Sequence, residues 1–314
     1  MTTLRQAVQE YVRMRRDLGF KLREPGKALP DFVRFLEQHR ASSISQALAL
    51  TWAQQPSHAQ PAHWAQRLSY VRGFAQYRSA TDPRTEIPPP GLLPFRPKRA
   101  RPYLYSDAEI RGLLRAALTM PCRYKRGQLR PWVYYTLFGL LSVSGLRVSE
   151  AQNLEVPDVD LTAAVLSIRG AKFGKTRLVP LHASTCQVLA EYLRRRTRHW
   201  RQRPVSSHVF VSSWGHRLDG GDIRRTFYAL SRQIGMRGPS DRHGPRLHDL
   251  RHRFATQTLV RWYRSHQDPE RKLPLLSADL GHVHVEDTQW YLNGSPELMR
   301  QAMHRLERRW EDRS

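Results

Sequence analysis

The most informative stretch of the sequence reads Leu280-Gly281-His282 and, a few residues later, Thr288-Gln289-Trp290-Tyr291. Upstream of it stand His248-Asp249-Leu250-Arg251-His252 and, further back, Ser144-Gly145-Leu146-Arg147-Val148-Ser149-Glu150. These phrases contribute arginine, histidine and tyrosine, which are side chains that bind or attack phosphate groups. Together they predict a site at which a tyrosine hydroxyl attacks a phosphodiester.

Cleavage of a phosphodiester by a protein nucleophile needs three kinds of group. The nucleophilic oxygen must lie in line with the leaving oxygen, cations must neutralise the transition state, and an acid must protonate the leaving oxygen. Arginine suits the second task because its planar fork binds two phosphate oxygens at once. Lysine or histidine suits the third task.

The composition favours a polyanionic partner. The 314 residues include 52 Lys and Arg against 27 Asp and Glu, which gives a formal net charge of +25. The start of the chain is not of signal-peptide type, and no apolar run approaches the roughly 20 residues that span a bilayer. Cys122 and Cys186 are too few for a disulfide framework. We therefore expect no membrane contact, a cytoplasmic setting and a nucleic-acid partner.

The chain divides by composition into two helical regions and a linker. Residues 1–82 carry four stretches of helical periodicity, the first marked by Leu4, Val8, Tyr11 and Val12. Residues 83–102 contain seven prolines and end in basic residues, which predicts an extended linker. Residues 103–314 form the third region. We expect two helical domains joined by a proline-rich basic linker.

Local signals place the elements of the third region. Ser106 and Glu109 form a capping-box pattern, and residues 132–143 are apolar enough for a buried helix. Residues 164–169 and 176–181 are predicted to be the two strands of a hairpin. Helices are expected at residues 183–198, 247–264 and 274–281, with an extended loop over residues 261–273. A last helix at about 296–310 should carry an apolar stripe made of Leu298, Ala302, Leu306 and Trp310.

These phrases, in this order, resemble the signature of the tyrosine recombinase (phage integrase) family. The resemblance covers roughly residues 103–292, and Tyr291 falls at the ninth position after His282, as the family's nucleophile does. It implies a mainly α fold with a small antiparallel β-sheet, in which two domains form a C-shaped clamp on double-stranded DNA. It also implies a site-specific recombinase, integrase or transposase of a mobile element that acts through a 3′-phosphotyrosine and a Holliday junction. By this resemblance residues 1–82 would be a helical core DNA-binding domain and residues 103–314 the catalytic domain of a nucleoid-associated protein.

The resemblance also implies a role for each site residue. Tyr291 would attack the phosphate, and Arg147 and Arg251 would clamp its non-bridging oxygens. His248 would accept the tyrosine proton or bind the phosphate, and His282 would donate a hydrogen bond to the phosphate. The general acid would be Lys172, in the turn of the hairpin, with Lys175 as its neighbour and the alternative choice. Glu150 would orient a histidine or an arginine.

Two features of the sequence allow more than one interpretation. Phe173 stands where the family often has glycine, which leaves the choice between Lys172 and Lys175 undecided. The last helix could pack on its own domain or dock on the adjacent protomer of a homotetramer, as in the family, and we favour docking. Accessory recombinases or DNA-bending proteins would be further partners.

Other functions fit parts of the same pattern. A type IB topoisomerase uses a similar set of arginine, lysine, histidine and tyrosine, and a catalytically silent protein could bind DNA with the same charge. A zinc site is disfavoured because the histidine spacing fits no common structural site. We therefore expect neither a metal nor a cofactor, and His252 is left as a core histidine.

Overall fold

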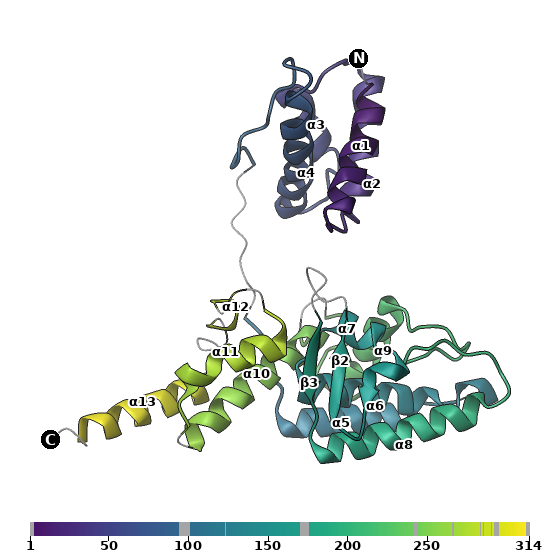
Figure 1. The fold of residues 1–314 in the computed structure, drawn as a ribbon, viewed down its shortest axis with the longest axis vertical. Helices are drawn as coiled ribbons and strands as arrows, with labels where there is room; N and C mark the ends of the chain where they lie inside the picture. Colours follow the sequence, from purple (N-terminus) through teal and green to yellow (C-terminus); the bar gives the residue numbers. More distant parts are fainter. Residues whose placement is uncertain are drawn as a thin grey trace. The chain divides into compact units, whose positions relative to one another are not determined.

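The computed structural model divides into two compact units, residues 1–100 and 101–314, each described by itself (Figure 1). It describes residues 3–93, 101–122, 124–169, 176–241, 244–265, 267–282, 284, 286–289, 291 and 295–311. The expectation of a mainly helical chain with a small antiparallel sheet is confirmed. Among the described residues, no helix is both long and apolar enough to cross a membrane.

The first unit is built from four helices: α1 (Leu4–Asp17), α2 (Pro25–Gln38), α3 (Gln46–Gln54) and α4 (Pro61–Ser79). A capping box between Thr3 and Gln6 starts α1. Leu4, Val8, Tyr11 and Val12, which mark the first predicted helix, are buried in one cluster with Phe32, Trp52 and Phe74. The N-terminal region therefore has its own hydrophobic core.

The first part of the predicted linker packs on this unit. Glu86 donates its backbone N–H to the carbonyl of Ile44 at 2.8 Å, and Arg72 donates to the carbonyls of Pro88 and Pro89 at 2.7 and 2.8 Å. Leu92 and Leu93 lie partly buried against the helical core. Residues 86–89 form neither helix nor strand, as their prolines predict, and hydrogen bonds from Arg72 hold this segment to the first unit.

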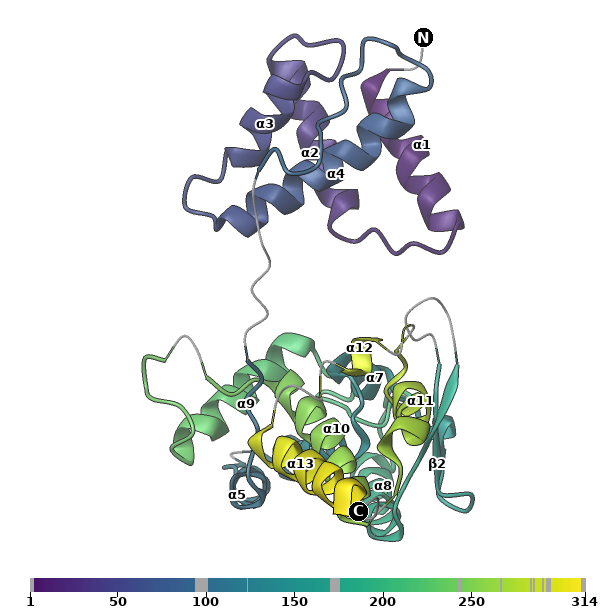
Figure 2. The ribbon, with the colours of Figure 1, turned by 90° about the vertical axis from the view of Figure 1, so that its left-hand side faces the viewer.

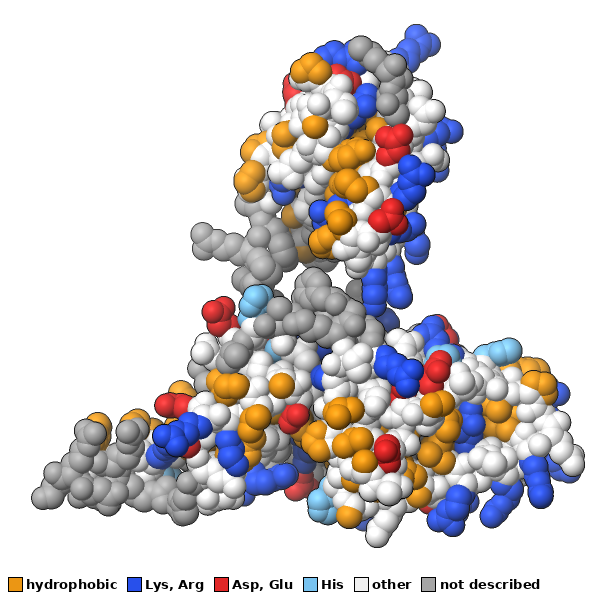
Figure 3. All heavy atoms as spheres, in the orientation of Figure 1, with side chains coloured by type: hydrophobic (Ala, Val, Ile, Leu, Met, Phe, Trp, Pro, Cys, Tyr) orange, Lys and Arg blue, Asp and Glu red, His pale blue; other side chains and the backbone are white. Residues whose placement is uncertain are grey.

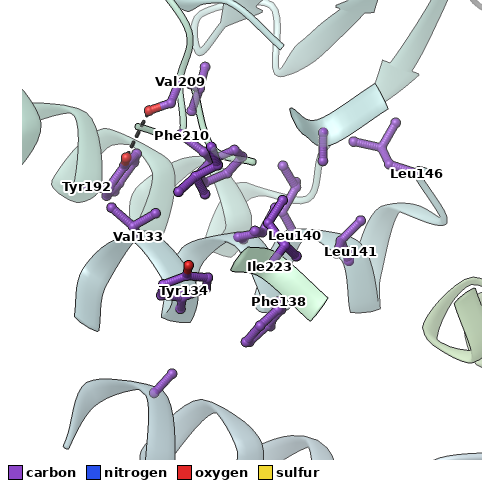
Figure 4. Packing of buried hydrophobic residues seen from close by; sticks show 14 of the residues in the cluster. Val133, Tyr134, Phe138, Leu140, Leu141, Leu146, Tyr192, Val209, Phe210 and Ile223 are labelled. Carbon is purple, nitrogen blue, oxygen red and sulfur yellow. Dashed lines mark hydrogen bonds between the residues drawn. The ribbon is translucent and has the colours of Figure 1, made fainter. Parts of the chain in front are cut away.

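The second unit has its main core around α6 (Arg130–Ser144). Packed with it are α5 (Asp107–Leu118), α8 (Ala183–Trp200) and α9 (Gly220–Gln233), and short α7 (Val148–Asn153) follows α6. Figure 4 shows Tyr134, Phe138 and Leu141 of α6 among apolar side chains of other elements. Tyr192 of α8 donates its hydroxyl to the carbonyl of Val209 at 2.8 Å. This core sets the position of the carboxyl end of α6, where Gly145 begins the first arginine phrase.

The sheet has three antiparallel strands in the order β1 (Val159–Asp160), β2 (Val165–Ile168) and β3 (Arg177–Pro180). The predicted hairpin is confirmed, with Leu166 paired to Val179 and Ile168 paired to Arg177. Leu166, Ile168 and Val179 are buried, which gives the strands one inner face. Lys172 and Lys175, in the segment that joins β2 to β3, lie outside the described residues.

The carboxyl-terminal part contains α10 (Leu247–Arg264), α11 (Pro269–Leu280), α12 (Glu286–Gln289) and α13 (Pro296–Glu311), seen from a second side in Figure 2. The expectation of an extended loop over residues 261–273 is wrong, because α10 continues to Arg264 and α11 begins at Pro269. Asp268 caps α11 by accepting the Glu270 N–H at 3.0 Å. Proline at the first helical position lacks an N–H that the helix does not need, so Pro269 starts α11 rather than breaking it.

Helix α13 has one face on its own unit and another in solvent. It packs against α10, with Leu298 buried there, and Glu297 pairs with Arg264 at 2.9 Å. The predicted stripe is therefore divided, since Leu298 is buried whereas Leu306 and Trp310 are 50% and 68% exposed. Met299 and Met303, 55% and 60% exposed, extend the exposed apolar face.

Candidate functional site

The turn after α6 positions the first arginine. Gly145 ends the helix with φ of +63°, a left-handed conformation that glycine adopts without strain. A side chain at this position would have its Cβ 2.4 Å from Phe254 Cδ1, so the turn also needs glycine for space. Two residues later Arg147 becomes the N-cap of α7. The segment Ser144-Gly145-Leu146-Arg147 thus ends α6 and directly begins α7.

Arg251 lies at the centre of the site and joins two distant phrases. It is 2% exposed, and its Nη1 and Nη2 donate to the carbonyls of Gly145 and Leu280 at 2.8 and 2.7 Å. Burial lowers the pKa of Arg251 and the neighbouring Tyr291 opposes that shift, but an arginine remains charged at neutral pH. A buried positive charge therefore stands beside the tyrosine.

Arg147 lies at the rim of this centre. Its Nη1 donates to Glu150 Oε1 at 2.8 Å, and its Nη2 donates to the Gly281 carbonyl at 3.1 Å. The backbone N–H of Arg147 also donates to Glu150 Oε2 at 2.8 Å. Glu150 therefore orients Arg147, which is one of the two roles that the sequence predicts for it.

Arg177 of β3 is a member of the cluster to which sequence analysis assigns no role. Its Nη1 and Nη2 bind both carboxylate oxygens of Glu150 at 2.9 and 2.8 Å. Burial would raise the pKa of Glu150, but the hydrogen bonds from Arg177 and Arg147 outweigh it and lower the pKa to about 2. The one signal for Arg177 in the sequence is a charged residue at the start of an otherwise apolar strand.

His282 is oriented by a threonine that sequence analysis also missed. Its Nδ1 lies 2.7 Å from the Thr288 hydroxyl, and Thr288 is fully buried. Burial, reinforced by Arg251 and Arg147, lowers the pKa of His282 to about 4. The ring is therefore neutral at pH 7, and if Nδ1 accepts from Thr288, Nε2 carries a hydrogen that can be donated.

Tyr291 is 5% exposed and lies among rings and aliphatic side chains. Its ring is stacked on His282 with centroids 5.9 Å apart, and His252 meets it edge-on at 5.1 Å. It belongs to the apolar cluster that includes Leu280 of α11 and Leu298 of α13. The position of the tyrosine thus depends on helices that lie both before and after it in the chain.

His248 and His252 lie one turn apart on α10. Their rings meet edge-on with centroids 5.0 Å apart, and His248 is exposed whereas His252 is buried. Neighbouring residues that displace water from part of the His248 ring, and then Arg251, lower the pKa of His248, although the side chain stays partly exposed. Burial and then His248 lower the pKa of His252 to about 4. His252 Nδ1 is buried without a hydrogen-bond partner among the described residues. The core position expected for His252 is confirmed, although it lies directly against Tyr291.

The site thus brings together Arg147, Glu150, His248, Arg251, His282 and Tyr291, six of the eight predicted residues, from α7, α10 and the segment after α11. The other two, Lys172 and Lys175, lie outside the described residues. Within the described part of the chain, no three His, Cys, Asp or Glu side chains are grouped so that they could hold a metal ion. The chemistry available here is that of cations, imidazoles and a phenol.

The chain is similar to proteins of one family in both sequence and fold. Residues 108–297 match the phage integrase family. A Sinorhizobium fredii protein named integrase/recombinase y4rB is 69% identical over 314 residues, 100% of both chains. Tyrosine recombinase XerC of Chlamydia caviae is 31% identical over 242 residues, 75% of this chain and 69% of the relative. The fold resembles the Tn1549 transposon integrase bound to transposon right end DNA, with a TM-score of 0.62, 17% identity and coverage of 96% and 98%.

The fold and the sequence therefore place this chain in the class of enzymes that cut and rejoin DNA strands. The chain belongs to the phage integrase family of tyrosine recombinases.

The lowered pKa values of His252 and His282 predict that the stability of the fold depends on pH. His252 and His282 have a pKa of about 4 in the folded chain, against about 6.5 when unfolded. Between these values the unfolded chain binds more protons, so the free energy of unfolding should rise with pH from 4 to 6.5 and fall on acidification. Urea unfolding of the full chain at several pH values measures this slope. The double variant His252→Gln, His282→Gln should flatten it, and an unchanged slope would contradict the assignment.

Proposed function

We propose that this tyrosine recombinase is a site-specific integrase or transposase of a mobile element, which exchanges DNA strands through a 3′-phosphotyrosine and a Holliday junction. The observation that carries the proposal is the contact of Tyr291 with His282 and its electrostatic interaction with Arg251. The net charge of +25 supports a DNA substrate, and Figure 3 shows Lys and Arg side chains spread over the visible faces of both units.

In the proposed reaction Tyr291 Oη attacks the scissile phosphorus and the bond to the 5′-oxygen breaks. The tyrosine proton passes to His248, and Lys172 protonates the leaving 5′-oxygen, with Lys175 as the alternative acid. The new bond joins Tyr291 to the 3′-phosphate. Because this linkage retains the energy of the phosphodiester, a 5′-hydroxyl from another strand can reverse the step and complete an exchange.

Arg147 and Arg251 supply the positive charge for the transition state. Arg251 is already held by two carbonyls, so its guanidinium does not need to reorganise when the phosphate gains charge. In the tautomer in which Nδ1 accepts from the Thr288 hydroxyl, His282 carries its hydrogen on Nε2 and donates it to the phosphate. This neutral donor stabilises a non-bridging oxygen without competing for the tyrosine proton.

The relatives support a role in moving DNA segments. The name of the 69% identical protein is integrase/recombinase, and a transposon integrase shares the fold. Chromosome-dimer resolution is the alternative within the family. A type IB topoisomerase would relax supercoils as a monomer without paired sites, and a catalytically silent protein would bind DNA without forming an adduct.

Trapping of the covalent intermediate tests the proposal. Binding sites are first selected from a random-sequence duplex library. They are then nicked next to the scissile phosphate, so that cleavage releases a short fragment that carries the 5′-hydroxyl and diffuses away. We expect an adduct that resists denaturation, with mass spectrometry locating the DNA on the peptide that contains Tyr291. Absence of an adduct on every selected site would support the silent binder, and relaxation of plasmids without paired sites would support the topoisomerase.

We propose further that four protomers assemble on two DNA sites through α13. The helix exposes Met299, Met303, Leu306 and Trp310 on one side, while Leu298 on another side touches the cluster that holds Tyr291. A neighbouring protomer that covers the exposed face would bury apolar area that now faces water. Docking of α13 would also affect the position of Tyr291, because Leu298 packs in the same cluster. Cleavage would then occur only after assembly.

This assembly predicts the behaviour of a surface variant. Met303→Glu with Leu306→Glu should leave binding to a single site unchanged and lower strand exchange between two sites by at least about tenfold, since each buried apolar side chain contributes roughly 1.5–3 kcal/mol. Sedimentation of protein–DNA complexes and exchange of labelled sites measure both effects. The matched control is Arg300→Glu on the same helix. Full exchange by the double variant would refute the assembly through α13.

A further inference from the structure

The carboxylate of Glu150 is shared by two arginines. Its Oε1 accepts from Arg147 Nη1 and Arg177 Nη1 at 2.8 and 2.9 Å, and its Oε2 accepts from Arg147 N and Arg177 Nη2, both at 2.8 Å. The side chains of Glu150 and Arg177 are 7% and 11% exposed, whereas that of Arg147 is 28% exposed. The outer arginine can therefore reach a phosphate while the inner one stays behind the carboxylate.

Arg177 also holds the backbone that leads to His282. Its Nε donates to the Asp279 carbonyl at 2.9 Å. A Cβ at Gly281 would lie 2.7 Å from Arg177 Nη1, so glycine at that position makes room for this side chain as well as providing φ of +65°. Each of the three guanidinium nitrogens of Arg177 thus bonds to or packs against the protein. We conclude that Arg177 acts on its neighbours rather than on the phosphate.

The charges explain why a second arginine is needed. Arg147 and Glu150 alone form an ion pair with no net charge, which would attract a phosphate weakly. With Arg177 the three side chains carry a net charge of +1, and the carboxylate still orients Arg147. At separations near 3 Å in a partly buried site these interactions are stronger than in water.

We propose that Arg177 is a positioning residue: it compensates the charge of Glu150, so that Arg147 keeps its positive charge for the phosphate, and it fixes the segment that carries His282. This inference rests on the proposed function, which assigns Arg147 and His282 to the scissile phosphate.

The test measures single-turnover adduct formation on nicked duplexes by the full chain. Arg177→Gln should slow the reaction about 100-fold, as expected when a phosphate ligand is misplaced, while the Kd for DNA changes less than about twofold. Arg177→Lys keeps the charge but not the planar fork, so it should be slowed less than Arg177→Gln. The matched control is Arg169→Gln, which removes an exposed arginine paired with Asp158 near the same hairpin and should leave the rate unchanged.

A second substrate separates charge compensation from a structural contribution. A methylphosphonate at the scissile position lacks the negative charge of the phosphate, so it depends less on the charge of Arg147. The penalty of Arg177→Gln, measured against the unaltered chain on the same substrate, should shrink at least about tenfold with methylphosphonate. An equal penalty on both substrates would overturn the charge compensation, and a rate equal to that of Arg169→Gln would overturn any role for Arg177.

The outcomes also separate this inference from the proposed function. If the unaltered chain forms no adduct at all, the proposed function fails. If the unaltered chain forms the adduct on Tyr291 and Arg177→Gln is as fast, only the inference about Arg177 fails. If Arg177→Gln does not fold, Arg177→Lys decides: it keeps the charge, so its penalty relative to Arg169→Gln should be equal on both substrates, and a penalty that shrinks with methylphosphonate would overturn the charge compensation.

Discussion

Replacing Tyr291 with phenylalanine is expected to abolish the covalent adduct with nicked DNA. The phenol oxygen is the proposed nucleophile, and loss of a nucleophile lowers enzymatic rates by roughly 10⁴–10⁶-fold. The substitution leaves the ring in place against His252 and His282, so the packing of the site is retained. The free energy of unfolding should change by about 1 kcal/mol or less, which is the usual contribution of one hydroxyl.

Gel separation of denatured protein–DNA complexes measures the adduct, and filter binding measures the affinity for DNA. Tyr263→Phe is the matched control, because Tyr263 packs against the same apolar cluster but lies outside the proposed reaction. It should form the adduct at the normal rate. An adduct that persists in Tyr291→Phe would show that another residue is the nucleophile, and loss of DNA binding would show that the ring position had changed.

Replacing Arg251 with alanine is expected to affect both activity and stability. Its guanidinium is one half of the proposed clamp, and removal of a comparable transition-state donor costs about 10²–10³-fold in rate. It also holds the carbonyls of Gly145 and Leu280, which would remain buried without these donors. Two such groups at about 1–3 kcal/mol each lead us to expect a loss of roughly 2–6 kcal/mol in the free energy of unfolding.

Urea unfolding and the adduct assay measure the two effects separately. Arg261→Ala, on an exposed position of the same helix, is the control and should change neither. Arg251→Lys keeps the charge but lacks the fork that reaches two carbonyls, so it should lose activity and part of the stability. A stable and active Arg251→Lys would mean that charge alone is required at this position.

Much of the architecture could be predicted because helical and strand periodicity are local properties. Leu4, Val8 and Tyr11 mark one helical face, and the capping box at Ser106 and Glu109 marks a helix start; both signals lie within a few residues. The loop expected over residues 261–273 was wrong for a related reason. Proline interrupts a helix or starts one, and capping by Asp268, seen in the structure, decides between the two at Pro269.

The sequence by itself determined which side chains we propose for the chemistry, since arginine, histidine and tyrosine stand in short phrases at characteristic spacings. Only the tertiary structure decided how they act on one another. Arg251 reaches carbonyls 106 and 29 residues away, and Arg177 pairs with a carboxylate 27 residues away. Such contacts depend on how α6, β3 and α10 pack. No local pattern encodes them, because the partners become neighbours only when burial of the apolar core brings these elements together.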